Sequence, residues 1–332
     1  MLTNFLDLFA RLLGPALVVF AVILILFCTY VFFDSIVPYY REVYQMALPI
    51  ELVLSTTGLF ILFNCLYNYY KAVVTSPGIP PLASDYGESG PETTRQPPSL
   101  RTALGNRLRQ YERLSDSEDE DHASRASGRM PVCSKCDRIR PPRTHHCSVL
   151  KSCVYRYDHY CPWIYNCVGY GNFKFFYLFL FHVFLVDMFF VLVSIPVFRY
   201  ALSLSVTDVA NLYLPGSQRP QVVMSFVLAA AVEIAMAGFL GLHTFLLLTN
   251  QTTMEWATGG YSRRFEGTLR QQAKFQRNPY DLGLKRNWQQ VMGNRGWWKW
   301  AFSFLHKDEA RDGEIVPSFP TVGVVHDTEH KE

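Results

Sequence analysis

The sequence predicts an all-α membrane protein with four transmembrane helices and a small cysteine-rich domain in the cytosolic loop between the second and third helices. Hydrophobic residues make up 49% of the 332 positions, whereas only 18% are charged. The apolar residues are gathered into four long blocks, and six of the eight cysteines lie between Cys133 and Cys167. Each block supplies the roughly 20 apolar residues that a helix needs to cross a bilayer core about 30 Å thick.

The pattern divides the chain into eight segments. The first apolar block, 12–33, is longer than the apolar core of a signal peptide and has no small-residue cleavage site, so we expect it to be retained as a span. In order, the predicted segments are a cytosolic N-terminus at 1–11, spans at 12–33 and 48–70, a linker at 71–130, the cysteine-rich domain at 131–174, spans at 175–198 and 222–248, and a cytosolic tail at 249–332.

The distribution of Lys and Arg predicts which side of the membrane each loop occupies. The segment 71–174 contains fifteen of these residues and the tail from 251 contains twelve, whereas 34–46 contains one and 199–221 contains two. Cytosolic loops carry the excess of positive charge, so both termini and the 71–174 loop should be cytosolic. The net charge of +3 is too small to indicate a nucleic-acid partner, and no basic recognition helix is present.

The linker and the tail have distinct compositions. From residue 82 the linker is rich in Ser, Pro, Glu and Arg, and its acidic run Asp116–Asp121 has no apolar partner, which predicts a largely disordered insert. In the tail, Arg295–Leu305 reads RGWWKWAFSFL, an aromatic and basic stretch that suits an interfacial helix on the bilayer surface. A packed amphipathic helix is the alternative for this stretch.

The cysteine-rich block has the spacing of zinc ligands. Cys133 and Cys136 form a CxxC pair, and further His and Cys residues follow at His145, His146, Cys147 and Cys153. In a reducing cytosol such a cluster indicates a metal site or catalysis rather than disulfides. The segment is too short to build a core of its own, so a bound metal would stabilise its fold. Buried cysteines without a metal are the alternative.

The stretch Asp158-His159-Tyr160-Cys161 has the chemistry of an activated nucleophile. A thiol is mostly protonated at neutral pH, so a nucleophilic cysteine needs a neighbouring base or positive charge, which His159 can supply. The carboxylate of Asp158 can orient that histidine. An additional zinc ligand is the alternative role for Cys161.

Taken together, these motifs resemble the cysteine-rich domain of the DHHC family of protein S-acyltransferases. The resemblance rests on the run CxxC…PPRxHHC…C…DHYCPWxxNCVGxxNxxxF. Three shorter stretches are similar to the family's DPG, TTxE and tail motifs: Ser76–Gly78, Thr252–Glu255 and Asn278–Gly293, which includes Asn287. With four spans in the family's order, the resemblance extends from the first span to about residue 293.

The resemblance implies an enzyme that takes a palmitoyl group from palmitoyl-CoA onto Cys161 and passes it to a cysteine thiol of a cytosolic or membrane protein. It makes His159 the base and Asp158 its polarising partner. Arg140, Arg143 and His145 occupy positions where the family has groups near the CoA phosphates, although a solvated basic patch is the alternative. The family also implies a multi-pass protein of eukaryotic endomembranes.

The family's domain holds two structural zinc ions, and the resemblance maps their ligands onto this chain. The first set is complete, with Cys133, Cys136, His146 and Cys153. The second set consists of Cys147, Leu150, Tyr160 and Cys167, so two of its four ligands are replaced. Zinc rarely persists on two protein ligands, and we therefore expect one zinc ion rather than two. Packing by Leu150 and Tyr160 would take the place of the second metal.

Two questions remain open at the level of sequence. The lost ligands are compatible with a non-enzymatic membrane adaptor that keeps one zinc, although the intact Asp158, His159 and Cys161 favour an enzyme. The spans also contain three ionisable residues, Asp187, Glu233 and His243, for which we expect hydrogen bonds between helices; a direct functional role is the alternative.

Overall fold

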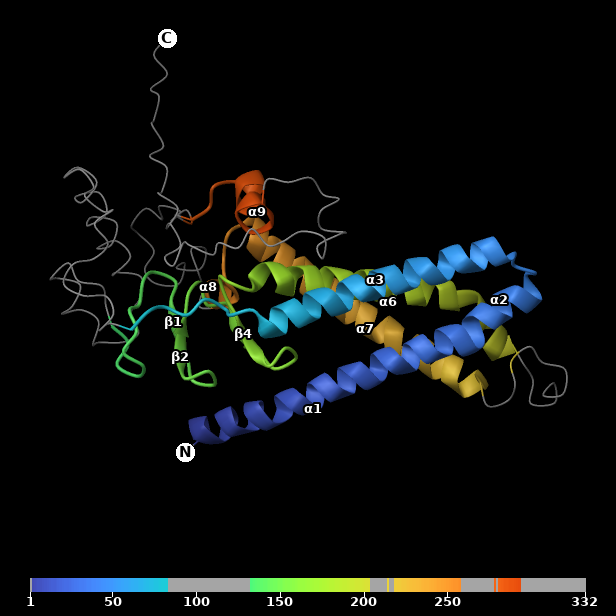
Figure 1. The fold of residues 1–332 in the computed structure, drawn as a ribbon, viewed down its shortest axis with the longest axis horizontal. Coiled ribbons are helices and arrows are strands. Elements are labelled where there is room, and N and C mark those ends of the chain that lie inside the picture. The colour runs from blue at the N-terminus through green and yellow to red at the C-terminus, as the bar shows by residue number, and fades with distance from the viewer. Residues whose placement is uncertain are drawn as a thin grey trace, which may run out of the picture.

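Four long helical segments form an elongated bundle that carries two β-hairpins at one end (Figure 1). The computed structural model describes residues 2–82, 132–203, 214, 218–257, 278 and 280–293. The predicted disorder of the linker and the predicted interfacial helix therefore lie outside the described residues. The helices are α1 (Leu2–Val31), the π-helical turn η1 (Phe32–Ile36), α2 (Val37–Val43), α3 (Leu48–Val74), α6 (Phe173–Ser203), α7 (Gln218–Leu248), α8 (Thr253–Ala257) and α9 (Leu284–Met292).

The predicted fold class is confirmed. Four helical segments are long and apolar enough to cross a membrane, and the cysteine-rich domain lies between the second and third of them. The helices extend beyond the predicted spans, most clearly at 34–43, which we expected to be a loop. There the chain turns once in a π-helix and continues as α2, whose second residue, Pro38, has no backbone N–H.

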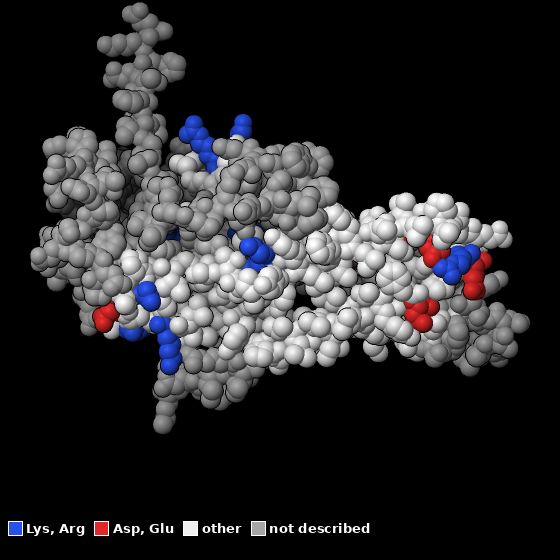
Figure 2. Space-filling view, viewed as in Figure 1, with Lys and Arg blue, Asp and Glu red and all other residues white. Residues whose placement is uncertain are grey.

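The surface of the bundle is that of a protein in lipid. Large apolar side chains along the helices are widely exposed, and Ile234 of α7 reaches 77%. Charged side chains gather at the two ends of the described surface, and the broad band between them shows none in this view (Figure 2). The N-terminus lies at the same end as the hairpins (Figure 1).

Two antiparallel hairpins make up the core of the cysteine-rich domain. The first pairs β1 (His145–Cys147) with β2 (Ser152–Val154), so that His146 lies opposite Cys153. The second pairs β3 (His159–Cys161) with β4 (Asn166–Val168), so that Cys161 lies opposite Asn166. Each hairpin turns through a residue with positive φ, Lys151 in the first and Tyr165 in the second.

The second hairpin is attached to the end of α3 by two buried asparagines. The last carbonyl groups of a helix have no partner within it. The Asn166 side-chain amide donates to the carbonyl oxygens of Val73 and Thr75, at 3.0 and 3.2 Å, and the Asn172 amide donates to that of Ala72 at 3.3 Å. These bonds satisfy the helix end and hold the hairpin against it.

The segment Ser76–Gly78 continues from α3 and crosses the outside of both hairpins. The Gly78 carbonyl accepts a hydrogen bond from the Tyr155 N–H at 2.8 Å, and the Pro77 carbonyl accepts one from the Gly171 N–H at 3.0 Å. The crossing is close: a Cβ at Gly169 would lie 2.7 Å from the Pro77 oxygen and 2.9 Å from the Tyr155 oxygen. Only glycine leaves room for this contact.

We therefore expect Gly169→Ala to destabilise the cysteine-rich domain by about 2–3 kcal/mol, because the added methyl group meets backbone atoms that cannot rotate away. Thermal unfolding of the detergent-solubilised full chain measures this effect. Gly241→Ala in α7 is the matched control, since its Cβ would meet nothing within 4 Å. Equal unfolding temperatures for the two variants would contradict the close approach.

Candidate active site and metal centre

The predicted first set of zinc ligands comes together in the structure. The ligand atoms of Cys133, Cys136, His146 and Cys153 all lie within 4.8 Å of one another. The sulfurs of Cys136 and Cys153 are 3.6 Å apart, and the Cys133 sulfur is 3.6 Å from Nδ1 of His146. Bonds of about 2.3 Å to sulfur and 2.0 Å to nitrogen at tetrahedral angles give edges of about 3.5–3.8 Å. The four residues therefore fit a structural zinc ion.

The positions of the second set form an apolar cluster instead. Cys147 and Cys167 are buried with Val154, and Leu150 and Tyr160 pack against them. Leucine offers no donor atom to a metal, and among the described residues only the first set groups three or more His, Cys, Asp or Glu side chains in this way. The arrangement supports the expectation that packing takes the place of a second zinc ion.

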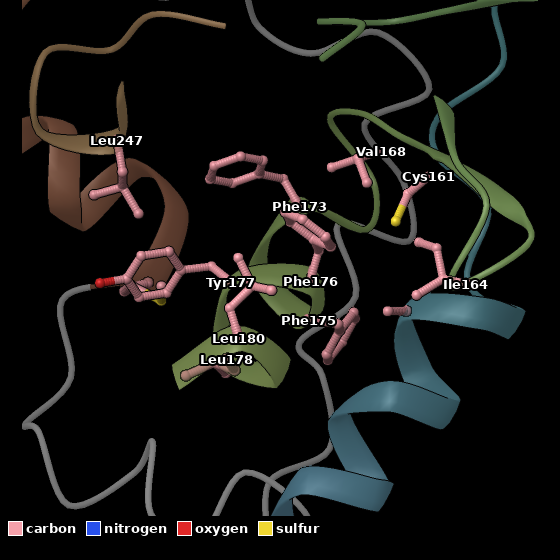
Figure 3. Close-up of a cluster of buried hydrophobic side chains, with 12 residues drawn as sticks. Cys161, Ile164, Val168, Phe173, Phe175, Phe176, Tyr177, Leu178, Leu180 and Leu247 are labelled. Carbon is pink, nitrogen blue, oxygen red and sulfur yellow. The ribbon is translucent and has the colours of Figure 1, made fainter. Parts of the chain in front are cut away.

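The short strand β3 arranges Cys161, the predicted nucleophile, and His159. Alternate residues of a strand point to the same side, so His159 and Cys161 share one face and Tyr160 points to the other. This alternation explains how a histidine two positions before the cysteine reaches its sulfur. Cys161 is 6% exposed and belongs to the apolar cluster at the start of α6, where Figure 3 shows its sulfur beside Val168 and Ile164.

A buried carboxylate orients the histidine. Asp158 is 2% exposed, and its Oδ2 accepts a hydrogen bond of 2.7 Å from Nδ1 of His159. The N–H and the hydroxyl of Thr253 donate to the same carboxylate at 2.8 and 2.7 Å. Burial disfavours the charge of Asp158, but the bonds from His159 and Thr253 outweigh burial and hold the pKa of this carboxyl below its ordinary value.

The histidine is held in its charged form. Burial lowers the pKa of His159, but the hydrogen bonds and negative charges of Asp158 and Cys161 outweigh this and raise it from 6.5 to about 9. His159 is therefore protonated at neutral pH. An imidazolium beside a cysteine sulfur is an arrangement that activates nucleophilic cysteines.

His243 of α7 also lies at this site. Its ring centroid is 5.8 Å from that of His159 and 5.1 Å from that of Phe176. Phe176 in turn contacts the His159 ring edge-on at 5.2 Å. The expected hydrogen bond between helices is not found at Nδ1 of His243, which is buried and has no partner among the described residues. His243 and Phe176 fix the plane of the His159 ring by packing.

The segment after α7 connects the carboxylate to the rest of the domain. Thr252 caps α8: its hydroxyl accepts from the Glu255 N–H at 3.2 Å, and Oε2 of Glu255 accepts from the Thr252 N–H at 2.8 Å. This reciprocal pair is a capping box. It presents Thr253, the next residue, to Asp158 and turns the Glu255 carboxylate toward Arg143.

Arg143 is fully engaged within the protein. Its guanidinium forms a two-point ion pair with Glu255, at 2.7 and 2.8 Å, and donates to the side chain and carbonyl of Asn250 at 3.1 and 3.0 Å. Its side chain is 9% exposed and lies 4.4 Å from the ring centroid of Tyr280. These contacts favour a structural role for Arg143 over contact with the CoA phosphates. Arg140 is half-buried and His145 is exposed.

Comparison with known proteins identifies the family. The family model described as DHHC palmitoyltransferase matches residues 127–259. The chain is 33% identical over 250 residues to probable protein S-acyltransferase 12 of Arabidopsis thaliana, covering 75% of this chain and 72% of that protein. The chain belongs to the DHHC palmitoyltransferase family. It is also 31% identical to palmitoyltransferase ZDHHC18 of Homo sapiens, over 67% of this chain and 59% of that protein. Its identity to palmitoyltransferase PFA3 of Yarrowia lipolytica is 30%, over 78% of this chain and 65% of that protein.

One residue of this site, Asn250, was not predicted from the sequence to have a role there. Asn250 is 4% exposed and has a positive φ of 48°. Its amide donates to the Tyr280 carbonyl at 2.8 Å and to the Gln290 side chain at 2.9 Å, while its oxygens accept from Arg143. Asn250 thus joins the tail to the cysteine-rich domain. Its position directly after an apolar span was the only signal in the sequence.

The tail motif has a similar function at the base of α7. Asn287 is 1% exposed, and its amide donates to the Leu248 carbonyl at 2.6 Å. Its side-chain oxygen accepts from the Leu282 N–H at 2.9 Å. These bonds place α9 against the last turn of α7. The tail therefore supports the helix end from which α8 and Thr253 follow.

For the metal centre, we expect purified protein to contain about one zinc ion per chain. Cys153→Ser should lose that ion, because Cys153 is fully buried among the ligands and serine oxygen is a poorer ligand. Elemental analysis of the purified full chain measures the content. Cys167→Ala is the matched control and should retain the metal; about two ions in the native chain, or loss in this control, would contradict the assignment.

For the Arg143–Glu255 pair, we expect Arg143→Ala to destabilise the folded chain by about 3 kcal/mol, because it leaves a poorly solvated carboxylate without its partner. Arg41→Ala is the matched control. Arg41 also forms a two-point pair, with Glu51, but its side chain is 58% exposed, so no measurable change is expected. Denaturant titration of both variants separates a structural role from surface electrostatics.

Proposed function

We propose that the chain transfers a palmitoyl or similar long-chain acyl group from acyl-CoA to cysteine thiols of proteins through an acyl-Cys161 intermediate. The observation that carries this proposal is the assembly of Asp158, His159 and the Cys161 sulfur at the end of an apolar bundle. The names of the relatives, which are protein S-acyltransferases and palmitoyltransferases, agree with it.

The residues present can carry out both half-reactions. In the first, the Cys161 sulfur attacks the thioester carbonyl, and His159 holds the cysteine proton and then delivers it to the departing CoA sulfur. In the second, a substrate thiol attacks the acyl-Cys161 carbonyl and gives its proton to His159, while the Cys161 sulfur leaves as a thiolate beside the imidazolium. Asp158 holds the imidazole in one tautomer and stabilises its charged form in both steps.

The proposed zinc ligands and the proposed nucleophile lie on different hairpins. The zinc set lies on the first hairpin and the loop before it, whereas the nucleophile lies on β3 of the second. A zinc ion bound to Cys133, Cys136, His146 and Cys153 would stabilise the fold, since all four positions are taken by protein ligands. Transfer itself requires only side chains of the second hairpin and of the helices around it.

The proposal includes the placement of the protein. Both termini and the cysteine-rich domain are assigned to the cytosol of a eukaryotic cell, in an endomembrane such as the ER or Golgi. Support comes from the excess of Lys and Arg in 71–174 and in the tail, and from the N-terminus lying at the hairpin end of the bundle (Figure 1). The acyl chain enters the bilayer side of the site, next to the aromatic side chains that follow Cys161.

For this function, we expect the purified chain to label itself with alkyne-tagged palmitoyl-CoA, and hydroxylamine should remove the label because it cleaves thioesters. Cys161→Ser should abolish the label, and Asp158→Asn should slow its appearance by at least about 100-fold, because the histidine loses its orienting carboxylate. Gel fluorescence over time measures both effects.

Cys28→Ala is the matched control, since Cys28 lies in α1 and outside the candidate site. It should label at the native rate. If the native chain retains zinc and unfolds cooperatively but takes up no label, a membrane adaptor would replace the enzyme as the proposed function. A label that persists in Cys161→Ser would move the nucleophile to another cysteine.

A further inference from the structure

The two cysteines left from the second zinc set lie closer together than metal ligands do. The Cys167 sulfur donates to the Cys147 sulfur at 2.9 Å. The corresponding sulfur pair of the first set, Cys136 and Cys153, is 3.6 Å apart, near the roughly 3.8 Å edge of a tetrahedral zinc site. The distance between the Cys147 and Cys167 sulfurs is thus about 0.9 Å longer than a disulfide bond of about 2.05 Å, and it is shorter than the distance between two sulfurs that share a zinc ion.

The remaining positions also argue against a metal. Leu150 contributes no side-chain donor, and its backbone N–H donates to the Cys147 sulfur at 3.5 Å. The Tyr160 hydroxyl is buried and has no partner among the described residues. Val149, Val154 and Tyr157 pack around the two sulfurs. The residues present do not fit a second zinc ion.

The pair also lies in a different cluster from the Cys161 sulfur. Cys147 and Cys167 are 3% and 0% exposed, and no other cysteine belongs to their cluster. Cys161 points to the opposite face of the second hairpin and belongs to a different cluster. Oxidation within the pair therefore leaves the nucleophile unchanged. The burial restricts the oxidant to a small neutral molecule such as hydrogen peroxide.

We infer that Cys147 and Cys167 form a thiol–disulfide site that provides the cross-link which a second zinc ion would otherwise provide. Two thiols lose two electrons and two protons and form one S–S bond, while hydrogen peroxide accepts them and becomes two molecules of water. The bond joins β1 of the metal-binding hairpin to β4 of the hairpin that carries the nucleophile. Oxidation thus locks the two hairpins together without using a catalytic or metal-binding sulfur.

The test uses the full, zinc-loaded chain in detergent, with and without hydrogen peroxide. Remaining thiols are alkylated under denaturing conditions, and the protein is digested without reduction for mass spectrometry. We expect the peptide of Cys147 linked to that of Cys167 to increase at least about tenfold on oxidation, with unchanged zinc content. The same cross-link should form in Cys161→Ser, which makes the result independent of acyl transfer. Recovery of both peptides in alkylated form, or links to Cys153 or Cys161 instead, would overturn the inference.

A second measurement tests the structural effect of the bond. Oxidation should raise the unfolding temperature of the native chain and leave that of the double variant Cys147→Ala, Cys167→Ala unchanged. Cys28→Ala is again the control and should respond like the native chain. If the double variant does not fold, the peptide analysis of the native chain still decides the matter. An equal response of the native chain and the folded double variant would exclude this pair as the site of oxidation.

Discussion

The position of Cys161, the proposed nucleophile, depends on the carbonyl groups at the end of α3 that have no partner within the helix. A helix that leaves a membrane must satisfy these groups at the boundary, and here the amides of Asn166 and Asn172 do so. Asn166 lies directly opposite Cys161 in the hairpin, so the same residue that satisfies the helix end also sets the height of the sulfur above it. The position of the Cys161 sulfur relative to α3 therefore depends on how the backbone carbonyl groups at the helix end are hydrogen-bonded.

A second constraint acts on the histidine from the other side of the site. The TTxE stretch serves as a compact connector: Thr252 caps α8, Thr253 binds Asp158, and Glu255 binds Arg143. Asn250 and Asn287 fix the segments before and after it. The orientation of one imidazole thus rests on hydrogen bonds from three separate parts of the chain, and the tail motif takes part in them.

The sequence was sufficient for features that depend on local pattern. Apolar blocks of more than 20 residues identify the four spans, and the CxxC pair with the later His and Cys identifies the metal ligands that meet in the structure. Contacts between segments that are far apart in the sequence could not be predicted from it. Arg143 and Glu255 are 112 positions apart, and no spacing indicates that they pair. His243 gave only the signal of an ionisable residue in a span, because its contact with His159 depends on how α7 packs against the hairpin.

Because side chains alternate along a strand, the three residues of β3 face two different environments. His159 and Cys161 face the apolar bundle, whereas Tyr160 faces the interior of the cysteine-rich domain. A substitution at Tyr160 therefore acts on the packing of the cysteine-rich domain, whereas one at His159 or Cys161 acts on the proposed reactive pair. Neighbouring positions of one strand can in this way be changed independently, because each faces a different environment.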